Sequence, residues 1–511
     1  MEKYIVGVDS GTSGVKAVLF DMSGNEIKKK GFPLHAYSPV ENWYEEDMDE
    51  IWEKARDAVR YVVEPFPAGS VAGIGVTAQG DGLWLLDADG RPVRKGCCFC
   101  DGRAGGTVEE WEGAGVTKKV FDLAGTRLST GNQPGILKWM ERNEPGSLEK
   151  TRYIMHLKDY LYMKLTGGVL SDASEQSLVF LDMEKRAYDK RLFDLYGLSA
   201  HMPKYPPVVE CEDSAAQLSG GAAAELGLTR NTVVTNGPMD VAACALGAGV
   251  TESGCCCSII GTAALHEMVI GKPCDDDIFA GMTVCHAMSD KWLRLMASYA
   301  GTPNIEWIFG LLGEELKLKA AAEKLDIYAY AEKLVADAPI GANGVMYHPY
   351  LLAGGERAPF FAPAARASFT GISVNHGIRD ILRAGYEGVA YAMMDCYMNM
   401  PLEVRRITLC GGGAKSAFWC QMFADAVGRD AVTVEGEELG AKGCFIANAR
   451  AQGFFGSYAE GVEKTVRPDK TYRSDPGRHE RYMKFYGLYK KTYISLSDTW
   501  KFRQNLVLDD A

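Results

Sequence analysis

The sequence of 511 residues lacks an apolar stretch long enough to span a bilayer, and no charged-then-apolar leader follows Met1. It also lacks an excess of basic residues, because its formal net charge is −12. An acidic chain has no general electrostatic attraction to nucleic acids or to anionic membranes. We therefore expect a cytoplasmic protein that binds small molecules, with neither nucleic acid nor a membrane as its partner.

Linkers rich in proline, glycine and serine are absent, and so are low-complexity tracts. Apolar residues make up 47% of the chain and charged residues 24%, which is typical of a folded soluble enzyme. A chain of 511 residues is long enough for two or more domains with large cores.

The fourteen cysteines do not have the spacing of a disulfide framework or of a tetrahedral zinc site. Two groups of three lie within residues 97–100 and 255–257. Adjacent residues of a strand point to opposite faces, so three consecutive cysteines do not converge easily on one metal ion. We expect reduced thiols that pack inside strands.

The sequence contains two glycine-rich turns, each of which lies between two apolar strands. Strands are predicted at residues 4–9 and 15–21 around the first turn, and at residues 255–260 and 264–269 around the second. Backbone N–H groups of such turns converge on phosphate oxygens, and threonine and serine hydroxyls add donors. An ordinary hairpin would explain either turn alone, but the repetition favours phosphate binding. The residues expected at phosphate are Gly11, Thr12, Ser13, Gly261 and Thr262.

Asp240 lies where a catalytic base is expected, between a strand predicted at residues 233–235 and a helix of small residues. Helix capping is the alternative role of this carboxylate. Phosphoryl transfer needs a carboxylate that accepts the proton of the nucleophile, and it needs Mg²⁺ to neutralise phosphate charge. We assign the first role to Asp240 and expect Asp9 to hold Mg²⁺, with turn capping as the alternative for Asp9. Lys16 would reach the transferred phosphoryl group, unless it is an ordinary exposed strand lysine.

A third glycine-rich turn, residues 411–416, follows a strand predicted at residues 407–410 and precedes a helix. A nucleotide would fit above this turn. Further helices are predicted at residues 49–64 and, as a packed terminal element, at residues 479–500.

The sequence resembles the FGGY carbohydrate kinases over nearly its whole length. Residues 8–16 are similar to the first phosphate motif of that family, residues 261–262 to the second, residues 411–416 to the adenosine motif, and Asp240 to the catalytic aspartate. The resemblance implies an α/β protein with a two-domain actin-like ATPase (ribonuclease H-like) fold, in which ATP and a sugar meet in the interdomain cleft. It also implies Mg²⁺ as a cofactor, a possible homodimer, and a division into residues 1–247 and 248–511.

The motifs and the resemblance together assign ligands residue by residue. The expected nucleotide-binding residues are Gly11, Thr12, Ser13, Lys16, Gly261, Thr262, Thr302, Glu306, Gly412 and Ser416. The expected metal ligands are Asp9 and Asp240, and the expected substrate-binding residues are Gln79, Gly80, Asp81, Asp101, Arg103 and Asp240. Turn formation is the alternative role of Asp81, and an ion pair with Arg103 is the alternative role of Asp101.

The substrate class follows from the same resemblance. The stretch 79–82 departs from the Gln-Met-His-Gly that is usual in D-xylulose kinases, because it contains Asp81. Residues 77–87, 347–360 and 386–397 are most similar to erythritol kinases and L-xylulose kinases. The predicted reaction is ATP-dependent phosphorylation of a terminal hydroxyl of a small polyol or ketopentose. The alternatives are a D-xylulose, ribulose or glycerol kinase of the same family, an actin-like ATPase acting on a protein partner, and a sugar sensor without catalysis.

Overall fold

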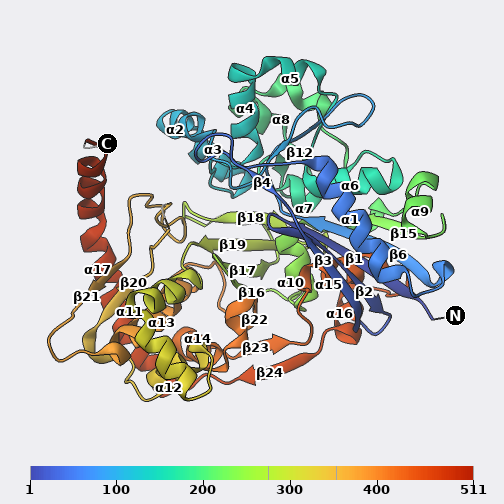
Figure 1. Ribbon diagram of the computed structural model, residues 1–511. Coiled ribbons are helices and arrows are strands. Elements are labelled where there is room, and N and C mark those ends of the chain that lie inside the picture. Colours follow the sequence, from blue (N-terminus) through green and yellow to red (C-terminus); the bar gives the residue numbers. More distant parts are fainter. Residues whose placement is uncertain (1, 274–275, 353, 510–511) are drawn as a thin grey trace.

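The computed structural model, which describes residues 2–273, 276–352 and 354–509, has two lobes, each built around one large β-sheet (Figure 1). In spatial order the first sheet contains β14 (Ala216–Gln217), β15 (Val233–Asn236), β6 (Val71–Ala78), β1 (Tyr4–Gly11), β2 (Gly14–Asp21) and β3 (Glu26–Pro33). Strands β1, β2 and β3 form an antiparallel meander, whereas β6 and β15 run parallel to β1. The short β14 closes the sheet in antiparallel pairing with β15.

The second sheet repeats this plan. In spatial order it contains β18 (Met282–Cys285), β19 (Trp292–Ser298), β17 (Ala264–Ile270), β16 (Cys255–Ile260), β22 (Arg406–Cys410), β23 (Ala431–Val434) and β24 (Pro468–Tyr472). Here β16, β17 and β19 form the meander, β22 and β23 run parallel to β16, and β24 closes the sheet in antiparallel pairing with β23. The two predicted meanders and the strands that carry the three glycine-rich turns are confirmed.

Helix α1 (Met48–Val63) covers β2 and β3, and its apolar stripe, which includes Ile51 and Val59, is buried. Its first turn is capped by the Asp47 side chain, which accepts from the N–H groups of Asp49 and Glu50. The other helices of the first half gather at the top of Figure 1 and beside α1. They are α2 (Gly105–Gly113), α3 (Val116–Ala124), α4 (Gln133–Asn143), α5 (Pro145–Lys150), α6 (Leu157–Thr166), α7 (Ala173–Gln176), α8 (Lys190–Tyr196) and α9 (Gly220–Leu226).

Helix α15 (Leu439–Ala451), which comes late in the chain, completes the core of the first lobe. It packs on β1, on β6 and on α10 (Asp240–Gly247). Glycines in the strands permit this close approach, because a Cβ atom at Gly7 would lie 2.2 Å from the Ala441 carbonyl oxygen. Asn448 then ties the helix to the sheet by donating hydrogen bonds to the carbonyl oxygens of Ile74 and Val233. Helix α16 (Tyr458–Thr465) lies beside α15.

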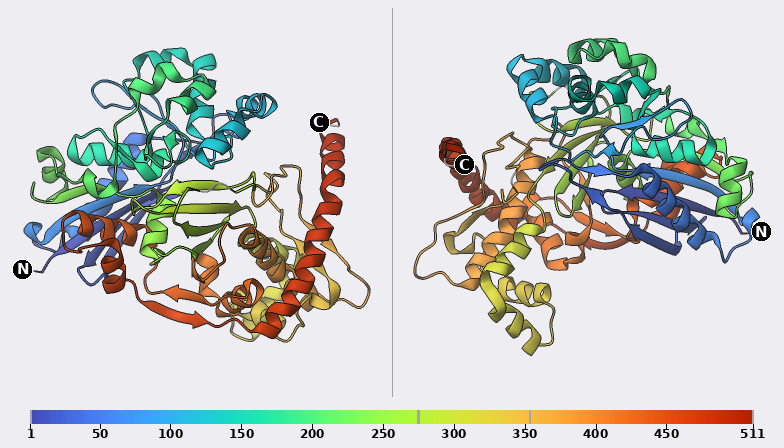
Figure 2. Two further views of the ribbon diagram at one scale, coloured as in Figure 1. Left: turned by 180° about the vertical axis from the view of Figure 1, so that it is seen from behind. Right: turned by 45° about the horizontal axis from the view of Figure 1, so that its top comes forward.

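The remaining helices flank the second sheet. They are α11 (Pro303–Ala322), α12 (Ile327–Ala336), α13 (Ile378–Met398), α14 (Ala417–Val427) and the terminal α17 (Pro476–Asp509). Figure 2 shows α17 as a long helix along the outer edge of the second lobe, where it buries Tyr482 and Tyr489. The predicted terminal helix is therefore confirmed and is longer than predicted. Within the described part of the chain, no helix combines the length and the apolar character that a membrane crossing requires.

Candidate active site

Asp240 is the first residue of α10, which follows β15 after a turn at residues 237–239. Its Oδ1 atom accepts a hydrogen bond from the Val241 N–H at 2.8 Å and would lie 3.5 Å from a Cβ atom at Gly80. The side chain stays partly exposed. Burial raises the pKa of Asp240 to about 6, which makes the carboxylate a stronger base than an ordinary aspartate while leaving it ionised at neutral pH.

Asp9 lies on β1, and the start of α15 approaches it so closely that a Cβ atom at Gly440 would lie 2.7 Å from Asp9 Oδ2. Burial, followed by the charge of Asp240, raises the pKa of Asp9 to about 7. The two predicted metal ligands are thus within electrostatic reach of each other. Two neighbouring carboxylates in a poorly solvated site fit a hard divalent cation such as Mg²⁺, which takes oxygen ligands and relieves their repulsion.

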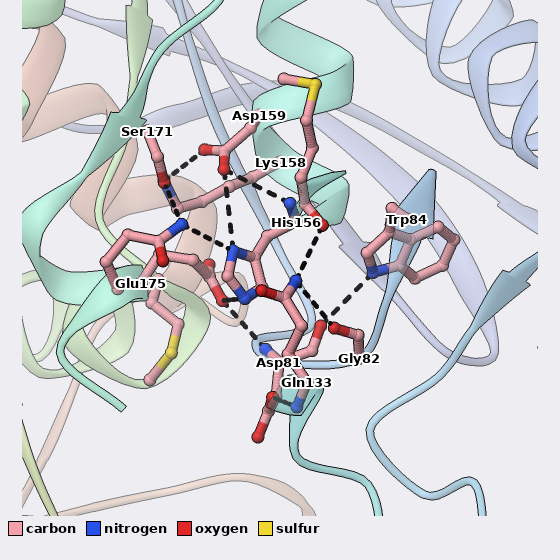
Figure 3. Close-up of polar contacts among 12 residues, drawn as sticks. Asp81, Gly82, Trp84, Gln133, His156, Lys158, Asp159, Ser171 and Glu175 are labelled. Atoms are coloured by element: carbon pink, nitrogen blue, oxygen red, sulfur yellow. Dashed lines mark hydrogen bonds and ion pairs between the residues drawn. The ribbon is translucent and has the colours of Figure 1, made fainter. Parts of the chain in front are cut away.

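A buried charged cluster anchors the turn that leads to Asp240, and Figure 3 labels two of its members, Lys158 and Asp159. Lys158 Nζ lies 2.5 Å from Asp172 Oδ1 and 3.3 Å from Asp159 Oδ1. Asn236, at the end of β15, donates to Asp159 at 2.7 Å and accepts from Lys158 at 3.2 Å. The Lys158 charge is therefore shared by two carboxylates and one amide that fix the end of β15.

A second contact fixes the other side of the same turn. The Met239 N–H donates to Ser174 Oγ at 2.8 Å, and Ser174 Oγ donates to Asp172 Oδ2 at 2.6 Å. Asp240 thus directly follows a turn that is anchored at both of its ends, at Asn236 and at Met239, which restricts the direction of its carboxylate. Lys158, Asp159 and Asp172 were not predicted, because they lie about 70 to 80 residues before Asp240 along the chain and belong to no motif.

Asp81 points into the protein. Its carboxylate accepts a hydrogen bond from the Gln133 N–H at 2.7 Å, and its own N–H donates to Glu175 at 2.9 Å (Figure 3). The carboxylate also accepts from the Asn132 side-chain amide. Burial raises the pKa of Asp81 to about 6. The backbone has φ of 64°, a turn conformation that aspartate tolerates better than most residues. The turn-forming alternative therefore has clear structural support.

The two residues before Asp81 differ in what lies next to them. Gly80 lies beside Asp240, whereas the side-chain amide of Gln79 is buried and donates to Glu46 at 2.8 Å. Of the three predicted sugar-binding residues in this turn, Gly80 is the one that the structure brings to Asp240.

Asp101 and Arg103 form a buried ion pair. Arg103 Nε donates to Asp101 Oδ1 at 2.8 Å, and the Tyr44 N–H donates to Asp101 Oδ2 at 2.8 Å. Arg103 also donates to Glu45 at 2.6 Å, and its guanidinium lies over the Trp43 ring at 4.1 Å. Both oxygens of Asp101 are thus engaged inside the protein, as expected for the ion-pair alternative.

The first two glycine-rich turns leave room for phosphate. A Cβ atom at Gly11 would have no heavy atom of the described residues within 4 Å. The second turn is held in place by Thr302, whose N–H donates to the Gly261 carbonyl oxygen at 2.8 Å, while Thr262 remains exposed. Lys16 forms an ion pair of 2.9 Å with Glu438, just before α15, and its side chain is 54% exposed. A phosphoryl group would therefore compete with Glu438 for Lys16.

A pocket of about 540 Å³ lies where the third glycine-rich turn meets α11, α12, α13 and α14. Its volume is within the range of nucleotide-sized sites. Four of the predicted nucleotide-binding residues line it, namely Thr302, Glu306, Gly412 and Ser416. Ser416 also caps α14 by accepting from the Trp419 N–H at 2.9 Å. These residues fit a bound nucleoside.

The same pocket contains residues that the sequence analysis missed. Tyr328 and Glu332 come from α12, and Tyr386 comes from α13. Burial raises the pKa of Glu332 above its ordinary value. The amphipathic pattern of residues 327–336 was the available signal, but it indicates a helix without indicating a ligand.

Comparison with known proteins decides the family. Residues 4–247 match the FGGY family of carbohydrate kinases, N-terminal domain, and residues 256–452 match its C-terminal domain. The chain belongs to the FGGY family of carbohydrate kinases. The family prediction is confirmed, and this FGGY kinase is an ATP-dependent carbohydrate kinase acting on a small molecule.

Its relatives are similar over nearly their full length. Erythritol kinase of Brucella abortus (strain 2308) is 30% identical over 510 residues, covering 97% of each chain. L-xylulose/3-keto-L-gulonate kinase of Escherichia coli (strain K12) is 28% identical over 504 residues, covering 97% of this chain and 98% of that protein.

Solved structures confirm the actin-like ATPase fold of this FGGY kinase. A gluconate kinase from Lactobacillus acidophilus superposes with a TM-score of 0.91 at 20% identity, covering 98% of this chain and 99% of that one. A xyloylose kinase from Brucella ovis superposes with a TM-score of 0.86 at 26% identity, covering 96% and 99%.

Proposed function

We propose that this FGGY kinase phosphorylates a terminal hydroxyl of a small polyol or ketopentose, similar to erythritol or L-xylulose, and releases ADP and a sugar phosphate. The observation that carries the reaction type is the partly exposed Asp240 carboxylate, which follows the anchored turn and raises the pKa of the neighbouring Asp9. The names of the relatives from Brucella abortus and Escherichia coli support the substrate class.

Asp240 is the base in this proposal. Its carboxylate accepts the proton of the substrate hydroxyl while that oxygen attacks the γ-phosphorus of ATP, and its pKa of about 6 suits proton transfer near neutral pH. When bound, Mg²⁺ held by Asp9 and Asp240 neutralises phosphate charge. The N–H groups of residues 11–13 and 261–262 hold the phosphates, and the pocket lined by Gly412 and Ser416 holds the nucleoside.

The predicted sugar-binding residues divide into one that lies beside Asp240 and four that are oriented inward. Gly80 lies next to Asp240, so its backbone is available to a substrate that reaches the base. Gln79, Asp81, Asp101 and Arg103 are oriented inward, so we propose that they shape the sugar site through the loops they hold.

The division of the chain is also a proposal. A boundary between residues 247 and 248 is supported by the family matches, which end at 247 and resume at 256. It is supported as well by the second meander, which begins at Cys255. Cytoplasmic location and a homodimer remain predictions.

ADP release from MgATP with a panel of substrates tests the proposal. The panel contains erythritol, ribitol, xylitol, glycerol, L-xylulose, D-xylulose, L-ribulose and D-ribulose. We expect erythritol or L-xylulose to stimulate release far above the others. A preference for D-xylulose, ribulose or glycerol would instead select the alternative kinase of the same family. Equal release with and without any sugar would contradict the proposal and support an actin-like ATPase acting on a protein partner.

A further inference from the structure

Three thiols from distant parts of the chain meet between the two lobes. They belong to Cys244 on α10, Cys257 on β16 and Cys410 on β22. The Sγ atoms of Cys257 and Cys410 are 3.7 Å apart, those of Cys244 and Cys410 are 3.9 Å apart, and all three lie within 4.8 Å of one another. Consecutive cysteines do not converge, as predicted, but these nonlocal ones do.

The thiol spacing matches that of a metal site. A tetrahedral zinc ion with Zn–S distances of about 2.3 Å places its sulfur ligands about 3.8 Å apart. The neighbouring Cys256 points to the other face of β16 and packs in the core of the second lobe. Cys256 is therefore a buried cysteine that is adjacent to the cluster in sequence but cannot join it. A substitution of Cys256 is a control for substitutions of the three clustered cysteines.

A buried carboxylate without a partner flanks the thiols. Glu267 lies directly opposite Cys257 in the β16–β17 ladder and is fully buried. Among the described residues, neither of its side-chain oxygens has a hydrogen-bond partner. An unsatisfied buried carboxyl group is costly unless a ligand compensates it.

We propose that Cys244, Cys257 and Cys410 form a binding site for a thiophilic divalent cation of the Zn²⁺ type. Glu267 supplies the oxygen donor after a change of its side-chain rotamer. The thiols bind as thiolates, so metal binding releases their protons to solvent and forms three metal–sulfur bonds. Cys244 is the least buried of the three, which makes its side of the cluster the entry path.

The position of the site predicts an effect on catalysis. Cys244 lies one helical turn after Asp240, and Cys410 directly precedes the nucleotide turn at residues 411–416. A metal ion bound here would tie the helix that carries the base to a strand of the second lobe. We expect occupancy to lower kcat, because phosphoryl transfer in a two-lobed kinase requires the lobes to close. This effect rests on the proposed function, whereas metal binding itself does not.

Titration of the reduced, full-length protein with Co²⁺ and Zn²⁺ tests the site. We expect one equivalent of Co²⁺ to give thiolate-to-metal charge-transfer absorption that Zn²⁺ displaces. Cys257→Ser should weaken binding at least tenfold, Glu267→Gln should weaken it less, and the control Cys256→Ser should bind as the wild type does. Should Cys257→Ser fail to fold, Cys244→Ala provides the same test on a partly exposed helical residue.

Two results would overturn the site. The first is absence of charge-transfer absorption in the wild type, or its persistence in both Cys257→Ser and Cys244→Ala. The second is a protein mass that is lower by two hydrogens after purification without reductant, in a protein that binds no metal. This result would identify an oxidisable thiol pair instead of a metal site.

Zn²⁺ should lower kcat in the wild type and in Cys256→Ser, and metal binding without this loss of kcat would overturn the inhibitory effect. A protein that binds metal but phosphorylates no sugar would contradict the proposed function alone.

Discussion

Asp81 and Asp101 differ from Asp9 and Asp240 in what surrounds their oxygens, although all four were predicted at the site. The carboxylates of Asp81 and Asp101 are buried and hydrogen-bonded by neighbouring loops. Asp9 and Asp240 remain partly exposed, and the charge of Asp240 contributes to the raised pKa of Asp9. The first two therefore act within the fold, while the second two are available to a ligand.

This difference separates two uses of one residue type. A carboxylate whose hydrogen bonds are satisfied inside the protein holds loops together, and its removal should cost stability. A carboxylate that is poorly solvated and is not engaged by side chains of other loops is poised to accept a proton or a cation, and its removal should cost activity. Substitutions at each pair can therefore test the comparison, beginning with the largest expected effect.

Replacing Asp240 by asparagine removes the base and keeps the shape of the side chain. We expect kcat to fall about a thousandfold, because general-base catalysis typically contributes a factor of about 10² to 10⁴. Thermal stability and nucleotide affinity should change little, since the anchoring contacts of the turn involve Met239 and Asn236. Turnover within tenfold of the wild type would remove Asp240 from the mechanism.

Replacing Arg103 by methionine should destabilise the protein by about 3 kcal/mol, because Asp101 and Glu45 would be left buried without their cation. The free energy of unfolding in urea measures this cost. The double variant Arg103→Met with Asp101→Asn should recover part of the loss, since one of the unpaired charges is then gone. Unchanged stability with a raised KM for the sugar would instead place Arg103 at the substrate.

Replacing Asp81 by asparagine should cost about 2 kcal/mol, because the new amide donor would face an existing donor. The Asn132 amide cannot simply rotate, since its oxygen already accepts from Ser129. Asparagine tolerates the positive φ of this position, so Asp81→Ala, which adds backbone strain, should cost more. Chemical unfolding compares the two variants. A neutral effect on stability with a large rise in KM would show that Asp81 contacts the sugar directly.

Local patterns were enough to predict much of the fold. The meander around residues 4–21 and its repetition around residues 255–269 follow from short apolar runs on either side of glycine turns. The helix that starts at Asp240 follows from a run of small residues after a strand. The return of α15 to the first sheet could not be predicted in this way. It depends on strand glycines such as Gly7 that make room for a helix more than four hundred residues later.

The site residues that face a ligand could be predicted where they belong to one sequence motif. Gly412 and Ser416 belong to one turn, and both line the pocket. Asp81 could not be oriented from sequence, because its partners Gln133 and Glu175 lie 52 and 94 residues away. Motifs indicate which residue types occur together, whereas burial and nonlocal donors decide which of them face a ligand.

Asp159 is a third carboxylate, after Asp81 and Asp101, whose hydrogen bonds are made inside the protein, and the pH dependence of stability tests it. Burial alone would raise the pKa of Asp159, but the charge of Lys158 and the hydrogen bonds lower it from 3.8 to about 2. Because the pKa in the folded state lies below that in the unfolded state, its contribution is present above about pH 4 and is lost as the pH falls toward 2. That contribution is on the order of 2 kcal/mol, and about 1 kcal/mol of it should be gone at pH 3.

The matched variant for this prediction is Asp159→Asn, which keeps the size of the side chain and removes its titration. Unfolding in urea between pH 6 and pH 3 should show the stability difference between the wild type and Asp159→Asn shrinking as the pH falls. A difference that stays constant over this range would mean that Lys158 is balanced by Asp172 alone. Asp159 would then not share the role of Asp81 and Asp101, and the anchor of the Asp240 turn would depend on the contact between Ser174 and Met239.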